Sequence, residues 1–441
     1  MSVLSKFLGS CGFRIATYNC YEVGHTWNES CSGAVTDIMG SAFGTSLRTY
    51  SFLYILTALL KWKGLRNFNY KRLSHDVLRS SVFLTTNALL FVFFLCEIRK
   101  VFGFWILPFV GFTNGLLASF FAILLEQKRR RGMLALYLTN LASELVFRMG
   151  YHRRYWGKLP KGEILVFATA LAGYFALLRK DSLDDSTSAA IRLVFGLKDG
   201  NDVLQLDSLP AWLARYLAKL RTKPKHRLCL HSHSCVSDAL EGFLRNFGVA
   251  FAVNGGLRLL GSIGTIIRSP SALPSLLFSQ RNLALPLMVG SLPAFYKLTR
   301  CMFRWNFDTD NALTHGISGF AAGLAMLFYS NVSVAMYVLW KLIEVLYFKG
   351  VSSGCLPFHK HGDILLYTLS TGFVLYAGCT EPHALRKEYW KFLMDLTGGA
   401  FGKVNRRIID VWGQDSSRAF PHFRPNLNPL KTTMNPFFLE I

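Results

Sequence analysis

Residues 101–125 read VFGFWILPFVGFTNGLLASFFAILL, a run without any Asp, Glu, Lys or Arg. Residues 311–340 form a second uncharged run, NALTHGISGFAAGLAMLFYSNVSVAMYVLW. A helix needs about 20 apolar residues to cross the hydrocarbon core of a bilayer. Backbone groups in that core must be hydrogen-bonded within the segment, so we expect these runs to form helices. The sequence therefore predicts an all-α, polytopic membrane protein.

The composition agrees with this prediction. Of the 441 residues, 51% are hydrophobic and 17% are charged, whereas soluble domains carry about 25% charged residues. The net charge is +23, and the basic residues are spread over short loops beside the apolar runs, such as Lys128 to Arg131. Loops of this kind suit anionic lipid headgroups. We therefore expect the lipid bilayer as a partner and do not expect nucleic acid.

The chain resembles itself at a nearly constant offset. Residues 134–150 align with residues 334–350, and the same offset pairs Trp105 with Trp305. The residues that coincide in the aligned stretches are Ala135/Ala335, Tyr137/Tyr337, Glu144/Glu344 and Gly150/Gly350. A slightly larger offset pairs Cys31 with Cys235. Several matches in the same order indicate an internal duplication.

Each copy carries five apolar segments. We predict them at 38–60, 80–97, 101–126, 133–149 and 163–179, and again at 243–267, 282–297, 311–329, 332–348 and 363–380. The fifth segment of each copy is short. Its length is compatible with spanning the bilayer, with lying in its interface and with re-entering it. Four spanning segments per copy would give both copies one orientation, and five would invert the second copy. Both arrangements remain open.

These segments divide the chain into five parts. The parts are a Cys/His-containing N-terminal segment at 1–35, a first helical membrane repeat at 36–180, a polar linker at 181–228, a second repeat at 229–380 and a basic, soluble tail at 381–441. Within the linker, residues 210–221 place apolar and basic side chains on opposite faces of a predicted helix. Such a helix suits a membrane surface or an ordinary protein docking site.

Small residues recur one helical turn apart inside the apolar segments. The pairs are Gly40 and Gly44, Gly115 and Ser119, and Gly319 and Gly323. Small side chains let helix backbones approach closely in a membrane. We expect these positions to pack helices within the chain, and a self-association face in a homo-oligomer is the alternative.

Charged residues interrupt or border the same segments. They are Arg48, Glu144, Lys341 and Glu344. A carboxyl group at mid-membrane costs a few kcal/mol, so we expect local ion pairs. Arg148 follows Glu144 by one helical turn, and Lys341 precedes Glu344 by about the same distance. A polar path or an ion-coupling site is the alternative interpretation.

Cysteine and histidine cluster just before each copy. The candidate metal ligands are Cys20, His25 and Cys31, and then Cys229, His231, His233 and Cys235. Thiolates and neutral imidazoles are the donors of tetrahedral zinc sites. The second spacing matches no common zinc finger, and reduced, unligated side chains in a juxtamembrane loop are the preferred interpretation. We expect no cofactor and find no motif that supplies catalytic residues.

Several stretches resemble the transmembrane protein 135 family of peroxisomal membrane proteins. They are residues 19–31 (NCYEVGHTWNESC), 130–150, 336–350 and 389–393, and the resemblance covers nearly the whole chain. That family is distantly similar to the mitochondrial inner-membrane translocase channel subunits, whose signature joins a basic and an acidic residue to a glycine-rich helix. Here Arg304, Asp308 and Asp310 precede that helix with a different spacing. Translocation activity is therefore not carried over.

The resemblance implies residence in the peroxisomal membrane, with the mitochondrial membrane as second choice. It also implies a role in peroxisome and mitochondrial organisation and in lipid and fat metabolism, together with organelle-membrane partners. We therefore expect a non-enzymatic regulatory or structural protein. The alternatives are a transporter or pore for lipids or small metabolites and, third, a membrane-bound lipid enzyme.

Overall fold

A computed structural model describes residues 3–60, 70–157, 159–197, 204, 209–269, 271 and 273–433. Helices make up 76% of the structure, and the described residues form no β-strand, which confirms the all-α prediction. The chain divides into two compact units. Unit 1 comprises Met1–Lys158 and His359–Ile441, and unit 2 comprises Leu159–Phe358.

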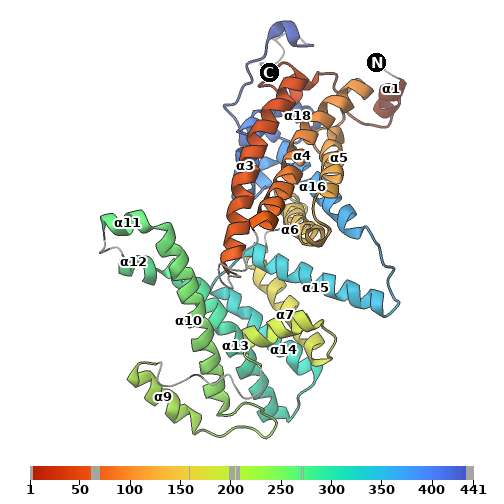
Figure 1. The fold of residues 1–441 in the computed structure, drawn as a ribbon. Coiled ribbons are helices and arrows are strands. Elements are labelled where there is room, and N and C mark those ends of the chain that lie inside the picture. Colours follow the sequence, from red (N-terminus) through yellow and green to blue (C-terminus); the bar gives the residue numbers. More distant parts are fainter. Residues whose placement is uncertain are drawn as a thin grey trace. The chain divides into compact units, whose positions relative to one another are not determined.

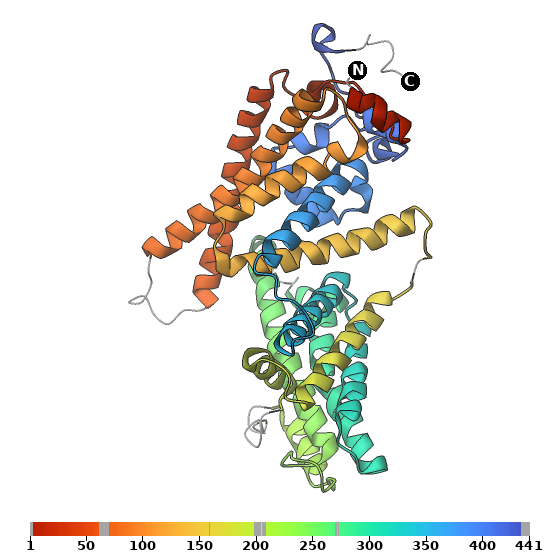
Figure 2. The ribbon, with the colours of Figure 1, turned by 90° about the vertical axis from the view of Figure 1, so that its right-hand side faces the viewer.

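Unit 1 is built around five long helices. They are α3 (Cys31–Leu60), α4 (Tyr70–Phe102), α5 (Phe112–Leu125), α6 (Lys128–His152) and α16 (Gly362–Thr380). Helix α3 packs on α4, α4 on α5, and α16 on both α5 and α6. In Figure 1, α3, α4, α5 and α16 lie side by side, and in Figure 2 α6 (gold) runs across them. The shorter helices are α1 (Val3–Ser10), α2 (Cys20–Val23), α17 (Lys387–Leu396) and α18 (Arg406–Ile409).

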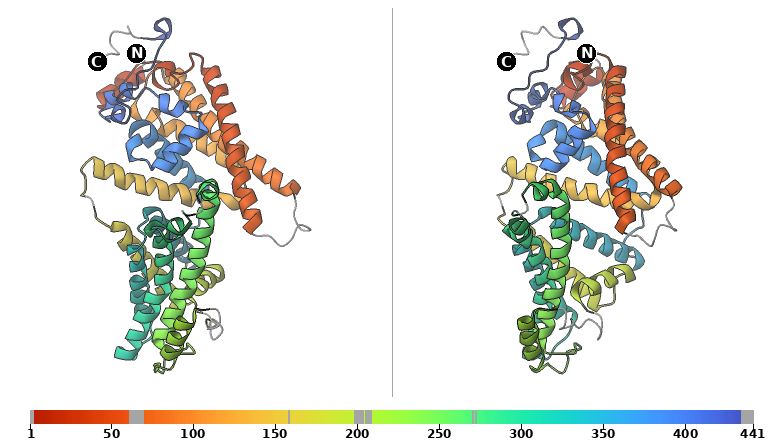
Figure 3. Two further views of the ribbon diagram at one scale, coloured as in Figure 1. Left: turned by 90° about the vertical axis from the view of Figure 1, so that its left-hand side faces the viewer. Right: turned by 60° about the vertical axis from the view of Figure 1, so that its left-hand side comes forward.

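Unit 2 has a corresponding set of long helices. They are α7 (Gly162–Arg179), α10 (Cys235–Gly261), α13 (Gln280–Phe307), α14 (Ala312–Gly323) and α15 (Val332–Ser352). Helix α10 packs on α13, as the green and teal ribbons of Figure 3 show, α13 packs on α14, and α7 packs on both α14 and α15. The shorter helices are α8 (Asp185–Phe195), α9 (Ala211–Arg221), α11 (Ile263–Arg268) and α12 (Leu273–Phe278).

The two units differ from the predicted division of the chain. Helix α7 was expected to close the first repeat but belongs to unit 2, whereas α16 was expected to close the second repeat but belongs to unit 1. Both fifth segments are apolar, so their composition predicts that they are removed from water. It does not predict which helices they pack against. The compact units therefore do not follow the expected repeat boundaries at 36–180 and 229–380, which stay a prediction.

The uncharged run at 101–125 is not one helix. Helix α4 ends at Phe102 and α5 begins only at Phe112. Between them Gly103 and Gly111 take positive φ angles of 77° and 133°, a region of backbone space that favours glycine. A Cβ on Gly111 would also lie 2.8 Å from the Cα of Tyr376. The turn therefore needs glycine both for its backbone conformation and for the close approach of α16.

The C-terminal segment is not a separate soluble tail. Leu385, Leu393, Phe401, Ile408 and Trp412 are buried in the same core cluster as residues of α3 to α6 and α16. The predicted part at 381–441 is therefore corrected over its described residues, which pack on the helices of unit 1 (blue in Figure 2). Basic composition concealed the apolar stripe of α17, which buries Leu393 and Leu396.

Three helical stretches are long and apolar enough to cross a membrane. They are Tyr70–Phe102, Leu107–Leu125 and Gly162–Arg179, and a shorter apolar stretch covers Ala312–Leu327. Each coincides with one of the predicted segments. The structure thus supports a membrane protein, and the number of crossings stays a prediction.

Candidate metal centres

The first cysteine–histidine cluster lies in unit 1. One ligand atom from each of Cys20, His25, Cys31 and Cys96 falls within 4.8 Å of every other. The sulfur atoms of Cys20 and Cys31 are 3.3 Å apart. Cys20 is the first residue of α2 and Cys31 is the first residue of α3, whereas Cys96 comes from the C-terminal half of α4. The cluster thus joins three helices.

Local structure explains how the N-terminal segment reaches α4. Asn19 caps α2 by accepting a hydrogen bond of 2.8 Å from the backbone N–H of Glu22, an ordinary helix-capping interaction. Gly24 follows α2 and lies so close to α4 that a Cβ would be 2.4 Å from Leu95 Cδ2. A larger residue there would require the Leu95 side chain to move, and the next residue, His25, lies close to Cys96.

The imidazole of His25 is oriented from one side only. Its Nδ1 lies 2.8 Å from the carbonyl oxygen of Asn28, so an N–H at this position donates to that oxygen. The side chain is fully buried, and its Nε2 has no hydrogen-bond partner among the described residues. A free Nε2 lone pair beside thiols is the arrangement of a metal-ligating histidine, whose other nitrogen is usually held by a carbonyl or carboxylate.

The thiol of Cys20 is activated. A hydrogen bond from Cys96 lowers the pKa of Cys20 to about 4, against the opposing effect of burial, and His25 and Cys31 lower it further. A thiolate, rather than a thiol, is the form that ligates a metal. The surroundings of Cys20 therefore favour its thiolate form.

The second cluster lies in unit 2. One ligand atom from each of Cys229, His231, Cys235 and Cys301 falls within 4.8 Å of every other. The Sγ atom of Cys229 is 3.7 Å from that of Cys235 and 3.9 Å from that of Cys301. Cys301 Sγ is 3.7 Å from Nε2 of His231. All three cysteines are buried.

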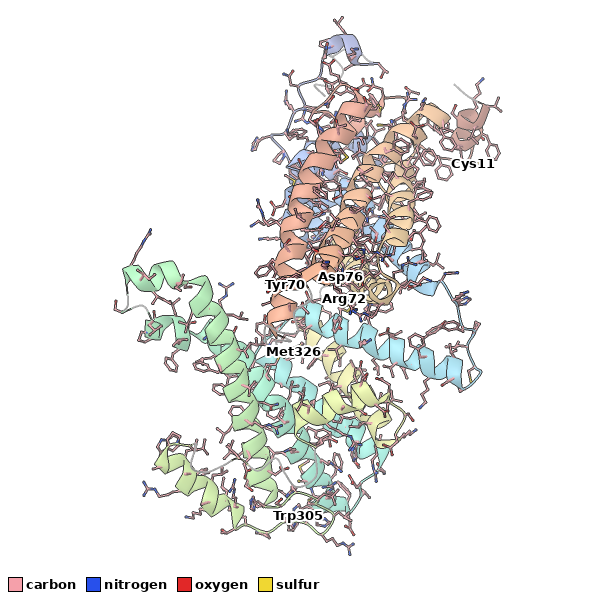
Figure 4. The ribbon with its side chains drawn as sticks, viewed as in Figure 1. Cys11, Tyr70, Arg72, Asp76, Trp305 and Met326 are labelled. Atoms are coloured by element: carbon pink, nitrogen blue, oxygen red, sulfur yellow. The ribbon has the colours of Figure 1, made fainter. Side chains whose placement is uncertain are left out.

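The surroundings of the second cluster repeat those of the first. Nδ1 of His231 lies 2.5 Å from the carbonyl oxygen of His233, which leaves Nε2 to face the sulfur atoms. Ser234 caps α10 through a hydrogen bond of 3.1 Å from the N–H of Ser237, and Cys235 is the first residue of that helix. Trp305, labelled in Figure 4, comes one turn after Cys301 on α13.

Sequence reasoning found part of each cluster. His233 was a candidate ligand, but the structure uses its backbone carbonyl, and its ring is not among the grouped donors. Cys96 and Cys301 were not candidates, because each lies inside a long helix far from the Cys/His motif. A signal was present nevertheless, since Cys96 follows Cys31 by 65 positions and Cys301 follows Cys235 by 66.

Both donor sets are closed in the chemical sense. Three sulfurs and one imidazole nitrogen complete a tetrahedral zinc shell, whereas catalytic zinc sites keep a position for water or substrate. The donors also connect elements that are distant in the chain. The arrangement is therefore suited to holding helices together rather than to activating a substrate.

The predicted acidic residues sit in ion pairs. Glu144 pairs with Arg148 at 2.5 Å, as expected, and also with Arg386, which the sequence did not suggest. Glu344 pairs with Lys341 on the preceding turn of α15. Arg48 is exposed on α3. Local pairing, the interpretation preferred from the sequence, describes both glutamates.

Asp310 gathers a polar network in unit 2. Its carboxylate accepts hydrogen bonds from Arg300 at 3.1 Å, Arg304 at 2.9 Å and His315 at 3.0 Å. Burial raises its pKa, but the bonds from His315 and the two arginines outweigh burial and hold the pKa well below the usual range. The side chain of Arg304 also reaches Cys229, so the network adjoins the second cluster. Asp308, by contrast, is an exposed partner of Arg227.

The small residues divide into two groups. Gly115 packs against Leu375, and the hydroxyl of Ser119 donates to the carbonyl of Thr368 at 3.4 Å. Gly319 and Gly323 pack on α7, where a Cβ on Gly319 would lie 2.7 Å from the carbonyl oxygen of Leu171. Gly40 and Gly44 differ, because a Cβ on either would meet nothing within 4 Å in the described part of the chain. Helix packing therefore accounts for two of the three pairs.

The chain has a recognisable relative among protein families. Residues 17–151 match the family model for the N-terminal cysteine-rich region of transmembrane protein 135. All four residues of the first cluster lie inside the matched stretch. No solved structure matches the chain. The distant similarity to translocase channel subunits stays a prediction, whereas the match of residues 17–151 to the cysteine-rich region supports a relationship to the transmembrane protein 135 family.

Proposed function

We propose that the chain is a non-enzymatic, multi-pass membrane protein of peroxisomes, and secondarily of mitochondria. Its role is regulatory or structural, in organelle organisation and in lipid and fat metabolism. The observation that carries the proposal is the match of residues 17–151 to the transmembrane protein 135 family. The three apolar helical stretches and the closed shape of both donor sets support it.

The proposal includes an origin by duplication, which the helix pairings support. In unit 1 the pairs are α3–α4, α4–α5, α5–α16 and α6–α16, and in unit 2 they are α10–α13, α13–α14, α14–α7 and α15–α7. The lists correspond term by term if α7 and α16 have exchanged places. Reciprocal exchange of a terminal element is a low-cost rearrangement between identical units.

The ends of α6 and α15 support the same origin in atomic detail. Tyr155 N–H donates to the carbonyl of Gly150 at 2.9 Å, and Cys355 N–H donates to that of Gly350 at 2.9 Å. The preceding residues, Arg154 and Gly354, both have positive φ angles. The side chain that then covers the glycine is Trp156 in one case and Leu356 in the other. Every one of these positions is related by the same offset.

Fractionation tests the membrane and organelle assignments together. The full chain with a small tag at either end should stay in the membrane pellet after alkaline carbonate washing and should follow peroxisomal markers. Protease protection of the two tags in intact organelles reports whether the ends share a side. Release of the chain by carbonate would overturn the membrane proposal, and exclusive recovery with another organelle would overturn the peroxisomal one.

Deletion of the gene, followed by re-expression of the full chain, tests the metabolic role. Cells lacking the chain should show altered neutral-lipid stores and altered peroxisome or mitochondrial number and shape, and the full chain should restore both. Normal lipids and organelles after complete loss would contradict the proposal. Turnover of a lipid substrate by detergent-purified protein would contradict its non-enzymatic part.

One observation favours a second candidate, a transporter or pore. The Asp310 network places a carboxylate, two arginines and a histidine together at the start of an apolar helix, and charges beside apolar helices often line substrate paths. Purified protein in liposomes should then move a metabolite or lipid, and Asp310→Asn should slow that flux. Absence of flux across a broad substrate panel would leave the structural role.

A further inference from the structure

We propose that each unit of this protein holds one structural Zn²⁺ ion. In unit 1 the ligands are Cys20, His25, Cys31 and Cys96, and in unit 2 they are Cys229, His231, Cys235 and Cys301. Each ion ties the first residue of one long helix to the last turns of the helix packed against it. The centres are metal sites in addition to the membrane role, and neither depends on that role.

The distances suit four ligands around a single ion. Zinc–sulfur bonds of 2.3 Å and zinc–nitrogen bonds of 2.0–2.1 Å at tetrahedral angles separate two sulfurs by about 3.8 Å and a sulfur from a nitrogen by about 3.6 Å. In the second centre, two of the three sulfur–sulfur distances are 3.7 and 3.9 Å, and Cys301 Sγ is 3.7 Å from His231 Nε2. In the first centre Cys20 and Cys31 are somewhat closer, at 3.3 Å.

A disulfide does not account for the clusters. It would join two sulfurs and leave a third cysteine and an imidazole without a partner in each unit. All of these cysteines are free thiols in the structure. Buried polar atoms are almost always hydrogen-bonded, but the fully buried Nε2 of His25 makes no hydrogen bond of regular geometry and has the Cys20 sulfur as its neighbour, which needs an explanation. A metal ion supplies one, because Nε2 is then a ligand.

The imidazole rings of the two histidines are oriented by the same kind of contact. Nδ1 of His25 faces the carbonyl of Asn28, and Nδ1 of His231 faces the carbonyl of His233. A bond from Nδ1–H to a backbone carbonyl fixes the tautomer with a free lone pair on Nε2, which is the usual second contact of a zinc-bound histidine. Two loops that differ in sequence therefore present the same histidine geometry.

The helical ligands occupy equivalent places in the two units. Cys31 begins α3 and Cys235 begins α10, while Cys96 and Cys301 each lie six residues before the end of α4 and α13. Thiolates are stabilised at helix N-termini, where the backbone N–H groups point toward them. Soft sulfur donors select zinc over calcium or magnesium. The repetition in two separate units makes a chance meeting of side chains a poor explanation.

Metal analysis of the full chain tests the proposal. Protein purified in detergent should contain two zinc ions per chain, as measured by inductively coupled plasma mass spectrometry. Cys31→Ser and Cys96→Ser should each lower the content to one, as should Cys235→Ser and Cys301→Ser, and Cys96→Ser with Cys301→Ser should abolish it. The matched controls are Cys11→Ser and Cys355→Ser, exposed thiols outside both clusters, which should keep two ions.

A histidine pair separates ligation from mere structural damage. His231→Ala should remove one ion, whereas His233→Ala should keep it, because His233 contributes only its backbone carbonyl. His231→Cys should retain the ion, since four thiolates also hold zinc. Replacement by Co²⁺ should give the visible absorption of tetrahedral thiolate-bound cobalt, and this absorption should halve in Cys301→Ser.

Several results would overturn the proposal. They are wild-type protein without zinc, zinc content that the cluster variants leave unchanged, and a Cys20–Cys31 or Cys229–Cys235 disulfide in protein isolated with thiols trapped. Iron in place of zinc would also overturn it. One zinc ion per chain would overturn it for the unit whose variants have no effect.

Discussion

The carboxylate of Glu144 accepts a hydrogen bond of 2.6 Å from Nε of Arg386, which lies 242 residues further along the chain. Glu144 is near the middle of α6, and Arg386 immediately precedes α17. The side chains are 4% and 15% exposed. The ion pair therefore connects α6 of unit 1 to the C-terminal part of the same unit. The buried carboxylate of Glu144 is the group that this C-terminal part binds.

Arg386→Met should destabilise unit 1 more than Arg148→Met. Removing one partner of a buried pair costs about 3–5 kcal/mol, and the remaining Arg148 should reduce the loss to the lower end of that range. Arg148 is 39% exposed, so its removal should cost about 1 kcal/mol or less. Thermal unfolding in detergent measures both. Equal shifts would contradict a docking role for Arg386, and Glu144→Leu with Arg386→Met should recover part of the loss.

Gly323→Ala should destabilise unit 2. A Cβ at this position would lie 2.3 Å from the Cα of Ala168 on α7, so α14 and α7 would have to separate, at a cost of about 1–3 kcal/mol. Gly44→Ala is the matched control, because it meets nothing within 4 Å in the described chain and alanine is the better helix former by about 1 kcal/mol. Melting in detergent compares them. A neutral Gly323→Ala would mean that the two helices are not in close contact.

Arg406→Lys should loosen the C-terminal part of unit 1 although it conserves the charge. The buried guanidinium donates to the carbonyls of Gly378, Phe401, Gly402 and Val404 at 3.1–3.3 Å. It also lies over the rings of Trp390 and Phe420. An ammonium group has fewer donors and no flat face, so we expect a loss of about 2–4 kcal/mol.

Limited proteolysis reads out the Arg406→Lys effect directly. Cleavage after α16 should become faster in this variant, and the exposed Lys403 offers a control in Lys403→Ala. Unchanged protection of the C-terminal part in Arg406→Lys would show that the charge alone suffices.

The start of α8 should weaken in acid through Asp184. This residue caps α8 and accepts a hydrogen bond of 3.0 Å from the N–H of Thr187. Hydrogen bonds from Ser186 and Thr187 lower the pKa of Asp184 to about 2. A depressed pKa means that the carboxylate stabilises the fold above its unfolded value of about 3.9, and that this contribution is lost as the pH falls toward 2.

Amide hydrogen exchange across residues 185–195 measures the acid effect. Exchange, corrected for its intrinsic pH dependence, should speed up between pH 4 and pH 2 in the wild type. Asp184→Asn should cap α8 without this dependence. Identical profiles for the two proteins would remove Asp184 as the titrating group.

Spacing along one helix predicted contacts well. Arg148 with Glu144 and Lys341 with Glu344 follow from the helical repeat alone, and the structure contains both pairs. The predicted contacts of Gly115, Ser119, Gly319 and Gly323 are also present. Small side chains on one face of an apolar helix let a neighbouring helix approach closely. Gly40 and Gly44 share the pattern but not the packing, so the motif indicates a possible close approach and not a neighbour.

The sequence by itself determined the helical class, the apolar character and the kinds of metal donor in each loop, because all three depend on local composition and spacing. Only the tertiary structure decided that Cys96 and Cys301 complete the clusters, that Arg386 meets Glu144, and that α7 and α16 belong to opposite units. Burial of apolar surface is not directional. The sequence shows which face of a helix is apolar. Which neighbouring helix covers that face depends on packing over the whole unit.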